Sequence, residues 1–89
     1  MTRDINELEV YKQSLKLIKE LYELLSQVPS TERDLESQLK RASKSIPANI
    51  AEGLQRNHRC LLIALASSDE VLAHLQVLSI VQPRLKPQV

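Results

Sequence analysis

The sequence predicts an all-α protein built from three helices. Of its 89 residues, 43% are hydrophobic, yet the aromatic residues are two tyrosines alone. A core built without phenylalanine or tryptophan depends on Leu, Ile, Val and Ala, the residues that interdigitate between helices. Apolar residues recur at spacings of three and four, the period of an amphipathic helix, and no segment has the pattern of a strand.

The first helix is expected from Val10 to about Gln27. Its apolar positions have the helical spacing throughout, and they are Tyr11, Leu15, Ile18, Leu21, Tyr22 and Leu25. The pair Val28-Pro29 ends this helix. Ser30 and Thr31 follow as candidate N-caps of the second helix, and Glu32 and Asp34 would lie near its positive end.

The second helix is expected to pass through a proline. The segment Arg41 to Arg56 reads RASKSIPANIAEGLQR. An interior proline costs roughly 3 kcal/mol, and Gly53 adds about 1 kcal/mol relative to alanine. The apolar stripe nevertheless keeps its phase across Pro47, at Leu35, Leu39, Ala42, Ile46 and Ile50. We therefore predict one helix that is kinked at Pro47 and ends or bends near Gly53.

The third helix is expected from about His58 to Val81. Its apolar pattern consists of Leu61, Leu65, Leu72, Leu75 and Leu78, and Ala64, Ala66, Ser67 and Ser68 form a waist of small residues. Small residues allow neighbouring helices to approach closely. We assign residues 1–82 to one bundle domain and residues 83–89, with two prolines, to an irregular tail.

Length and composition point to a small cytoplasmic protein. A chain of 89 residues buries only about 60 to 65% of its unfolded surface, so oligomerisation would stabilise it. No apolar run approaches the roughly 20 residues that span a bilayer, and the N-terminus is too polar for a secretory signal. The single cysteine, Cys60, cannot form an internal disulfide and is expected to be a packing residue.

The segment around Pro47 resembles a known family. Its residues reproduce the signature RA..SI..NIAEG..R of the four-helix-bundle proteins named for 23S rRNA intervening sequences, through Arg41-Ala42, Ser45-Ile46, Asn49 to Gly53, and Arg56. Leu8 to Tyr11 is similar to the L.VW opening of that family, and Ile63 to Ser67 with Glu70 is similar to its IA.GS..E segment. The resemblance covers about residues 5 to 80.

The resemblance implies an up-and-down antiparallel bundle that assembles into homo-oligomeric rings, pentamers in the characterised cases, without known catalytic activity. Relatives include the accessory variability determinant of diversity-generating retroelements, which binds nucleic acid and a reverse transcriptase. This chain departs from the family between Arg56 and Ile63, which is shorter by about one helical turn. The family's fourth helix is also absent before Val89, so an apolar groove is expected to be exposed.

The signature residues lie on one side of the second helix. At 100° per residue, Arg41, Ser45, Asn49, Glu52 and Arg56 fall within a stripe roughly 80° wide. One interpretation is a binding surface. The interpretation that we favour is architectural: Arg41, Asn49 and Glu52 satisfy one another and the neighbouring helix, through Glu70, and fix the register. Gly53 belongs to the same signature.

A basic segment offers an alternative function. Residues 38–62 carry five Lys or Arg against Glu52 alone, a net charge of 5 − 1 = +4. An RNA- or DNA-binding module could use this segment from Lys40 to Arg59, because a few exposed cations supply sequence-independent affinity for phosphates. The candidate nucleic-acid contacts are Lys40, Lys44, Arg56, His58 and Arg59.

Catalysis finds no support in the sequence. His58 and Cys60 do not have a zinc-site spacing, and one glycine nearly excludes a phosphate loop. The serines before Asp69 are expected to be packing residues. We therefore expect a non-catalytic, self-assembling adaptor that binds a partner protein, for instance a reverse transcriptase, with no cofactor, metal or small-molecule substrate.

Overall fold

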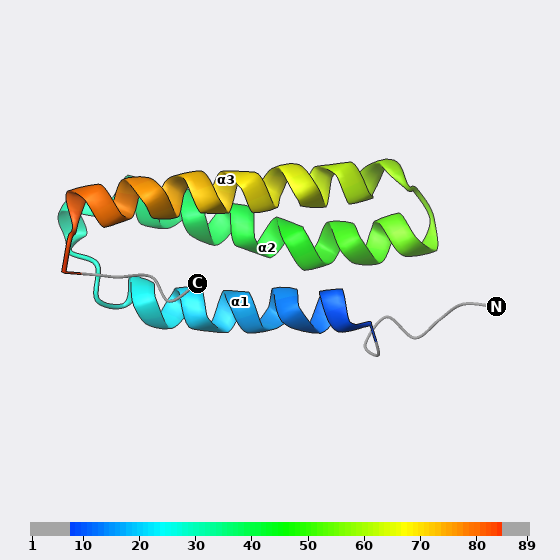
Figure 1. The fold of residues 1–89 in the computed structure, drawn as a ribbon, viewed down its shortest axis with the longest axis horizontal. Helices are drawn as coiled ribbons and strands as arrows, with labels where there is room; N and C mark the ends of the chain where they lie inside the picture. Colours follow the sequence, from blue (N-terminus) through cyan, green and yellow to red (C-terminus); the bar gives the residue numbers. More distant parts are fainter. Residues whose placement is uncertain (1–7, 85–89) are drawn as a thin grey trace.

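The computed structural model describes residues 8–84. In this part of the chain, three helices and one short 3-10 turn follow one another: α1 (Glu9–Leu25), η2 (Ser30–Glu32), α2 (Arg33–Gln55) and α3 (Arg59–Val81). The helices run up, down and up, so each is antiparallel to the next (Figure 1). The predicted all-α bundle of three helices is confirmed. Most of the predicted tail lies outside the described residues.

Helix α2 is the central element. It packs against α1 on one side and along α3 on the other, and its contact with α3 is the more extensive (Figure 1). The predicted apolar stripe of α2 is confirmed, because its members are buried or packed against the core. The buried core consists of Leu21, Leu25, Leu39, Ala42, Ile46, Ile50, Ala64, Val71, Leu75 and Leu78.

Pro47 lies inside α2, as predicted. The helix is continuous from Arg33 to Gln55, and both Pro47 and its neighbour Ile46 are buried. Proline has no backbone N–H, so the carbonyl of Ser43 loses the donor that an ordinary residue at position 47 would supply. Burial of the stripe on both sides of the proline offsets that loss and keeps the chain helical.

The predicted ends of the helices need two corrections. Ser30 and Thr31 do not cap α2, because they form η2, and the residue at the N-cap of α2, Glu32, makes no side-chain capping bond. Instead the Glu32 N–H donates to the Pro29 carbonyl over 3.0 Å. Helix α1 ends at Leu25 rather than Gln27, because the chain tightens into a turn there.

The buried face of α3 differs from the prediction. Leu75 and Leu78 are buried, but Leu61, Leu65 and Leu72 are exposed. In their place α3 buries Ala64, Ser67 and Val71 against α2. Small residues on both sides of this contact, such as Ser45 and Ser67 with hydroxyl oxygens 2.9 Å apart, allow the two backbones to approach, so leucines of α3 are left on its flanks. Leu15 of α1 is also exposed, by 45%, and Ser14 beside it is buried.

Gly53 permits the close approach of α2 to the start of α3. A Cβ atom at this position would lie 2.6 Å from Cγ and Cδ2 of Leu61 and 2.9 Å from the backbone nitrogen of Leu61. A rotamer change can move the side-chain atoms but cannot move the nitrogen. Any larger residue would therefore push the α2–α3 turn apart, which explains glycine at this signature position.

Candidate protein-binding groove

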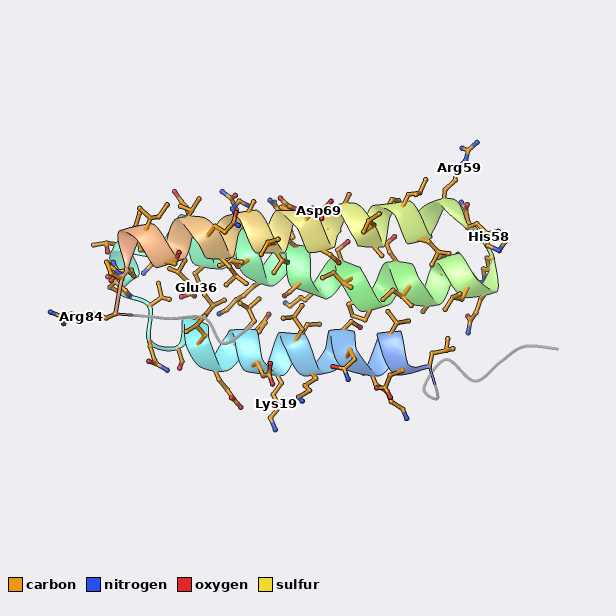
Figure 2. The ribbon with its side chains drawn as sticks, in the orientation of Figure 1. Lys19, Glu36, His58, Arg59, Asp69 and Arg84 are labelled. Atoms are coloured by element: carbon orange, nitrogen blue, oxygen red, sulfur yellow. The ribbon has the colours of Figure 1, made fainter. Side chains whose placement is uncertain are left out.

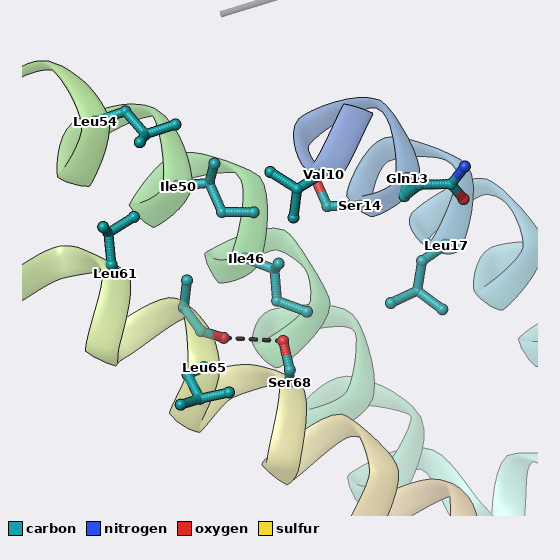
Figure 3. A pocket seen from close by; sticks show the side chains of 11 residues that line it. Val10, Gln13, Ser14, Leu17, Ile46, Ile50, Leu54, Leu61, Leu65 and Ser68 are labelled. Atoms are coloured by element: carbon teal, nitrogen blue, oxygen red, sulfur yellow. Dashed lines mark hydrogen bonds between the residues drawn. The ribbon is translucent and has the colours of Figure 1, made fainter. Parts of the chain in front are cut away.

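Residues of α1, α2 and α3 together line an apolar groove (Figure 3). Its volume is about 430 Å³. Three residues of α2 line it at successive turns: Ile46, Ile50 and Leu54. The remaining lining comes from α1 and α3, as Val10, Gln13, Ser14, Leu17, Leu61, Ala64, Leu65 and Ser68. No charged residue is among these eleven.

The hydroxyl groups in the groove are already hydrogen-bonded within their own helices. Ser14 Oγ donates to the Tyr11 carbonyl over 2.6 Å. Ser68 Oγ donates to the Ala64 carbonyl over 2.9 Å, the bond drawn in Figure 3. Satisfied hydroxyls add little polarity to a surface, so the groove favours an aliphatic occupant.

The apolar surface continues from the groove onto the outside of α3. Among residues 8–84, eleven large hydrophobic residues are exposed, and eight of them belong to this helix: Leu61, Leu62, Ile63, Leu65, Leu72, Val77, Ile80 and Val81. Leu62 is 68% and Ile80 76% exposed. A helix that is apolar on all sides is normally buried on all sides. In this structure α2 covers only one side of α3.

Helix α3 bears on the expectation that no apolar run is long enough to span a bilayer. Among residues 8–84, α3 is long enough and apolar enough to cross a membrane, judged by length and composition. The mean hydropathy of its best window is 1.4. Core helices of soluble proteins have the same composition, and 28% of that window is buried inside the bundle. Composition alone does not separate these two kinds of helix.

The structure brings together part of the predicted signature network. Asn49 Nδ2 donates to the carbonyl and to Oγ of Ser45, both over 2.8 Å. Ser45 Oγ lies 2.9 Å from Ser67 Oγ of α3. These three residues form a polar contact between α2 and α3, which supports the architectural interpretation for Ser45 and Asn49.

The other signature residues do not join this network. The Glu52 carboxylate lies 3.9 Å from the guanidinium of Arg56, one turn along the same helix, and the two side chains are 45% and 76% exposed. Glu70 faces His74 at 3.6 Å along α3. Arg41 is exposed. Among residues 8–84, no hydrogen bond or ion pair joins Arg41, Asn49 and Glu52 to one another or to Glu70, so the expected network does not form.

The predicted cations form two separate groups. Lys40 Nζ lies 4.9 Å from the centre of the Tyr22 ring and 3.2 Å from Glu36, and Lys44 Nζ lies 5.9 Å from the same ring. His58 and Arg59 lie at the α2–α3 turn (Figure 2), next to Arg56. The helical rise separates Lys40 from Arg56 by about 24 Å. These residues do not make one continuous basic patch.

Six of the eleven groove-lining residues belong to the patterns that the sequence shows, whereas the other five do not: Val10, Gln13, Ser14, Leu17 and Leu54. Leu54 and Val10 lie outside the apolar stripes that the helical period predicts, and Leu62 and Ile80 are on the outer side of α3. One signal was available: α3 carries apolar residues on every face, more than one neighbouring helix can cover. Within residues 8–84, no three His, Cys, Asp or Glu side chains gather as metal ligands would.

Fold and groove together define a small helical-bundle protein with an open apolar surface. Residues 6–82 match the family model described as 23S rRNA-intervening sequence protein. The chain belongs to this family, as the resemblance around Pro47 implied. Neither curated proteins nor solved structures gave a match to the chain.

Proposed function

We propose that this chain is a non-catalytic, self-assembling accessory protein that binds protein through the groove and the outer side of α3. The observation that carries the proposal is the exposure of eight large aliphatic side chains on one helix. The exposed fractions of Leu62, Leu65, Leu72 and Ile80 add up to the surface of about two and a half fully exposed side chains. At about 1.5–3 kcal/mol per side chain, covering them would contribute roughly 4–8 kcal/mol.

A protein partner suits this surface better than nucleic acid does. Phosphate binding needs exposed cations, whereas the groove lining has none. Lys40 is held by Glu36 and, with Lys44, lies over Tyr22. The remaining group at the α2–α3 turn is small. The RNA- or DNA-binding alternative therefore rests on Arg56, His58 and Arg59.

A protein partner also suits α3 better than a membrane does. Asp69 and Glu70 lie in the middle of the helix. A charged residue at the centre of a bilayer costs about 2.5–3.5 kcal/mol even on the lowest scales. A partner helix can leave Asp69 at a solvated rim, so the same residues cost little in a protein interface. This argument agrees with the expected cytoplasmic location.

Light scattering of the full chain at micromolar concentration tests the proposal. We expect a mass that is a multiple of 10.1 kDa, and the resemblance implies five copies. A well-folded protein of 10.1 kDa throughout this range would contradict the proposal. Retention on heparin at low salt that is lost in Arg59→Ala but kept in Lys19→Ala would instead support the nucleic-acid alternative; Lys19 projects from the far side of α1 (Figure 2).

As the partner protein we propose a reverse transcriptase, which the resemblance to retroelement accessory proteins implies. The support is the signature around Pro47. Co-expression with the reverse transcriptase of a diversity-generating retroelement should give a complex that survives gel filtration at high salt, because the surface is apolar. Separate elution of the two proteins at every salt concentration would exclude this partner.

A further inference from the structure

The groove has the form of a seat for one apolar helix. Ile46, Ile50 and Leu54 are spaced four apart on α2, so this side extends about 12 Å, a little over two helical turns. Helices α1 and α3 run in the same direction on either side of it (Figure 1). An occupant must be helical and must present aliphatic residues without charges over at least two turns.

Helix α3 itself meets this requirement better than the other helices. Its charged residues are Arg59, Asp69 and Glu70 in a length of 23 residues, which leaves an uncharged stretch on each side of the acidic pair. Helix α1 carries six charged residues in 17: Glu9, Lys12, Lys16, Lys19, Glu20 and Glu23. Helix α2 presents its longest uncharged stretch, Ser45 to Ala51, largely to the interior.

The outer side of α3 has the shape of a docking stripe. At 100° per residue, Leu62, Leu65, Leu72 and Ile80 fall within about 80° of the helix circumference, and Asp69 lies in the same sector. The half of this stripe from Leu72 to Ile80 carries no charge and is about 12 Å long, which matches the length of the groove. Each is about half exposed or more. We propose that the groove of one copy seats this outer side of α3 from a second copy of the chain, an inference that rests on the self-assembly proposed above.

The available area is sufficient for such a contact. Seven exposed aliphatic residues belong to the groove or the stripe: Val10, Leu54, Leu61, Leu62, Leu65, Leu72 and Ile80. Their exposed fractions add up to the surface of nearly four fully exposed side chains. Taking about 60–120 Å² for each aliphatic side chain gives roughly 240–470 Å² of apolar area per copy. Apolar atoms form about 65% of a homodimer interface, so two copies bury roughly 700–1,400 Å² in total. The upper half of this range exceeds the about 1,000 Å² expected of a specific interface.

The contact is reciprocal when two copies pair about a two-fold axis. Each α3 then lies in the groove of the other copy, and the same residues contribute on both sides. If instead each copy inserted its α3 into the groove of the next copy, the copies would close into a ring. In both arrangements Leu65 serves twice, because it lines the groove and belongs to the outer stripe.

Light scattering of three full-length proteins tests this inference separately from self-assembly. Wild type should give a multiple of 10.1 kDa. Leu65→Glu should raise the Kd of assembly at least about 100-fold and yield monomer at micromolar concentration, because a carboxylate replaces a buried aliphatic group. Leu15→Glu is the matched control, since Leu15 is an exposed leucine of α1 outside the groove, and it should assemble as wild type does.

Photocrosslinking gives a second readout that does not depend on the fold of Leu65→Glu. A benzophenone side chain is introduced at Val10, which lines the groove and is 57% exposed, or at Leu15 as the control. This protein is mixed with ¹⁵N-labelled wild type and irradiated. Trypsin cuts after Arg59 and Arg84, so α3 is released within one peptide. The Val10 probe should capture the heavy form of that peptide, and the Leu15 probe should not.

The outcomes separate the two proposals. An assembled Leu65→Glu protein together with a Val10 probe that captures other peptides of the heavy copy would overturn the seating of α3 and leave self-assembly standing. A monomeric wild type would overturn both. If that monomer floated with vesicles of phosphatidylcholine and phosphatidylglycerol, a membrane surface rather than a second copy would be the occupant.

Discussion

Substitution of Gly53 by alanine should destabilise the bundle although alanine is the better helix former. In an open helix the change would gain about 1 kcal/mol. Here the new Cβ would lie 2.6 Å from the Leu61 side chain and 2.9 Å from the Leu61 backbone nitrogen. Overpacking of this kind costs about 1–3 kcal/mol, and the contact with backbone places it in the upper half. The net loss should be about 1–2 kcal/mol, or a fall in Tm of roughly 4–16 °C.

Thermal unfolding of four proteins at one concentration measures this effect. Wild type, Gly53→Ala, Leu61→Ala and the double variant form a double-mutant cycle. Removing the Leu61 side chain should recover part of the loss, since the contacts at 2.6 Å disappear and the contact with the nitrogen remains. An unchanged or raised Tm in Gly53→Ala would refute the argument that glycine is needed for the close approach of α2 to α3.

Three further predictions concern stability measured by chemical denaturation. Leu39→Ala removes a side chain with no exposed surface and should cost about 2–5 kcal/mol, enough to unfold a marginal domain; a loss under 1 kcal/mol would place Leu39 outside the core. Asn49→Ala removes two hydrogen bonds to Ser45 and should cost about 1–2 kcal/mol, whereas no change would exclude an architectural role for Asn49. Glu52→Ala breaks only a solvated ion pair and should change stability by less than about 0.5 kcal/mol; a larger loss would show that Glu52 has a structural role beyond that pair.

The second helix was predictable because its polar and apolar residues separate cleanly. Charged residues such as Arg33, Asp34 and Arg41 are exposed on α2, so the helical period identifies one buried stripe. That stripe keeps its phase across Pro47, and for this reason the proline could be placed inside a helix. Local patterning and tertiary packing agree in this segment.

The third helix was less predictable because apolar residues surround it. Leu65 and Leu75 look equivalent in the sequence, yet one is 60% exposed and the other 7%. The choice between them depends on the close contact of Ser67 with Ser45, a tertiary feature that periodicity does not contain. An exposed apolar groove was expected from the missing fourth helix, but its full lining was not predictable, since its residues are combined only by the packing of three helices.

The signature was located correctly, and one part of its predicted role changed. Gly53 acts between helices through a close approach, and Asn49 donates to Ser45, whose Oγ lies 2.9 Å from Ser67 Oγ of α3. Glu52 was expected in a buried network, but its carboxylate is solvated beside Arg56. A sequence motif shows that residues belong together without showing which of them face inward.

The most direct test of the central claim is the concentration dependence of Tm. If other copies of the chain cover α3, folded protein is stabilised by mass action. For a pair of copies, a 100-fold increase in concentration contributes about 2.7 kcal/mol, or about 1.4 kcal/mol per chain. We therefore expect Tm to rise by roughly 5–11 °C. A sharp transition at the same temperature over the whole range would contradict the claim that α3 is an assembly surface.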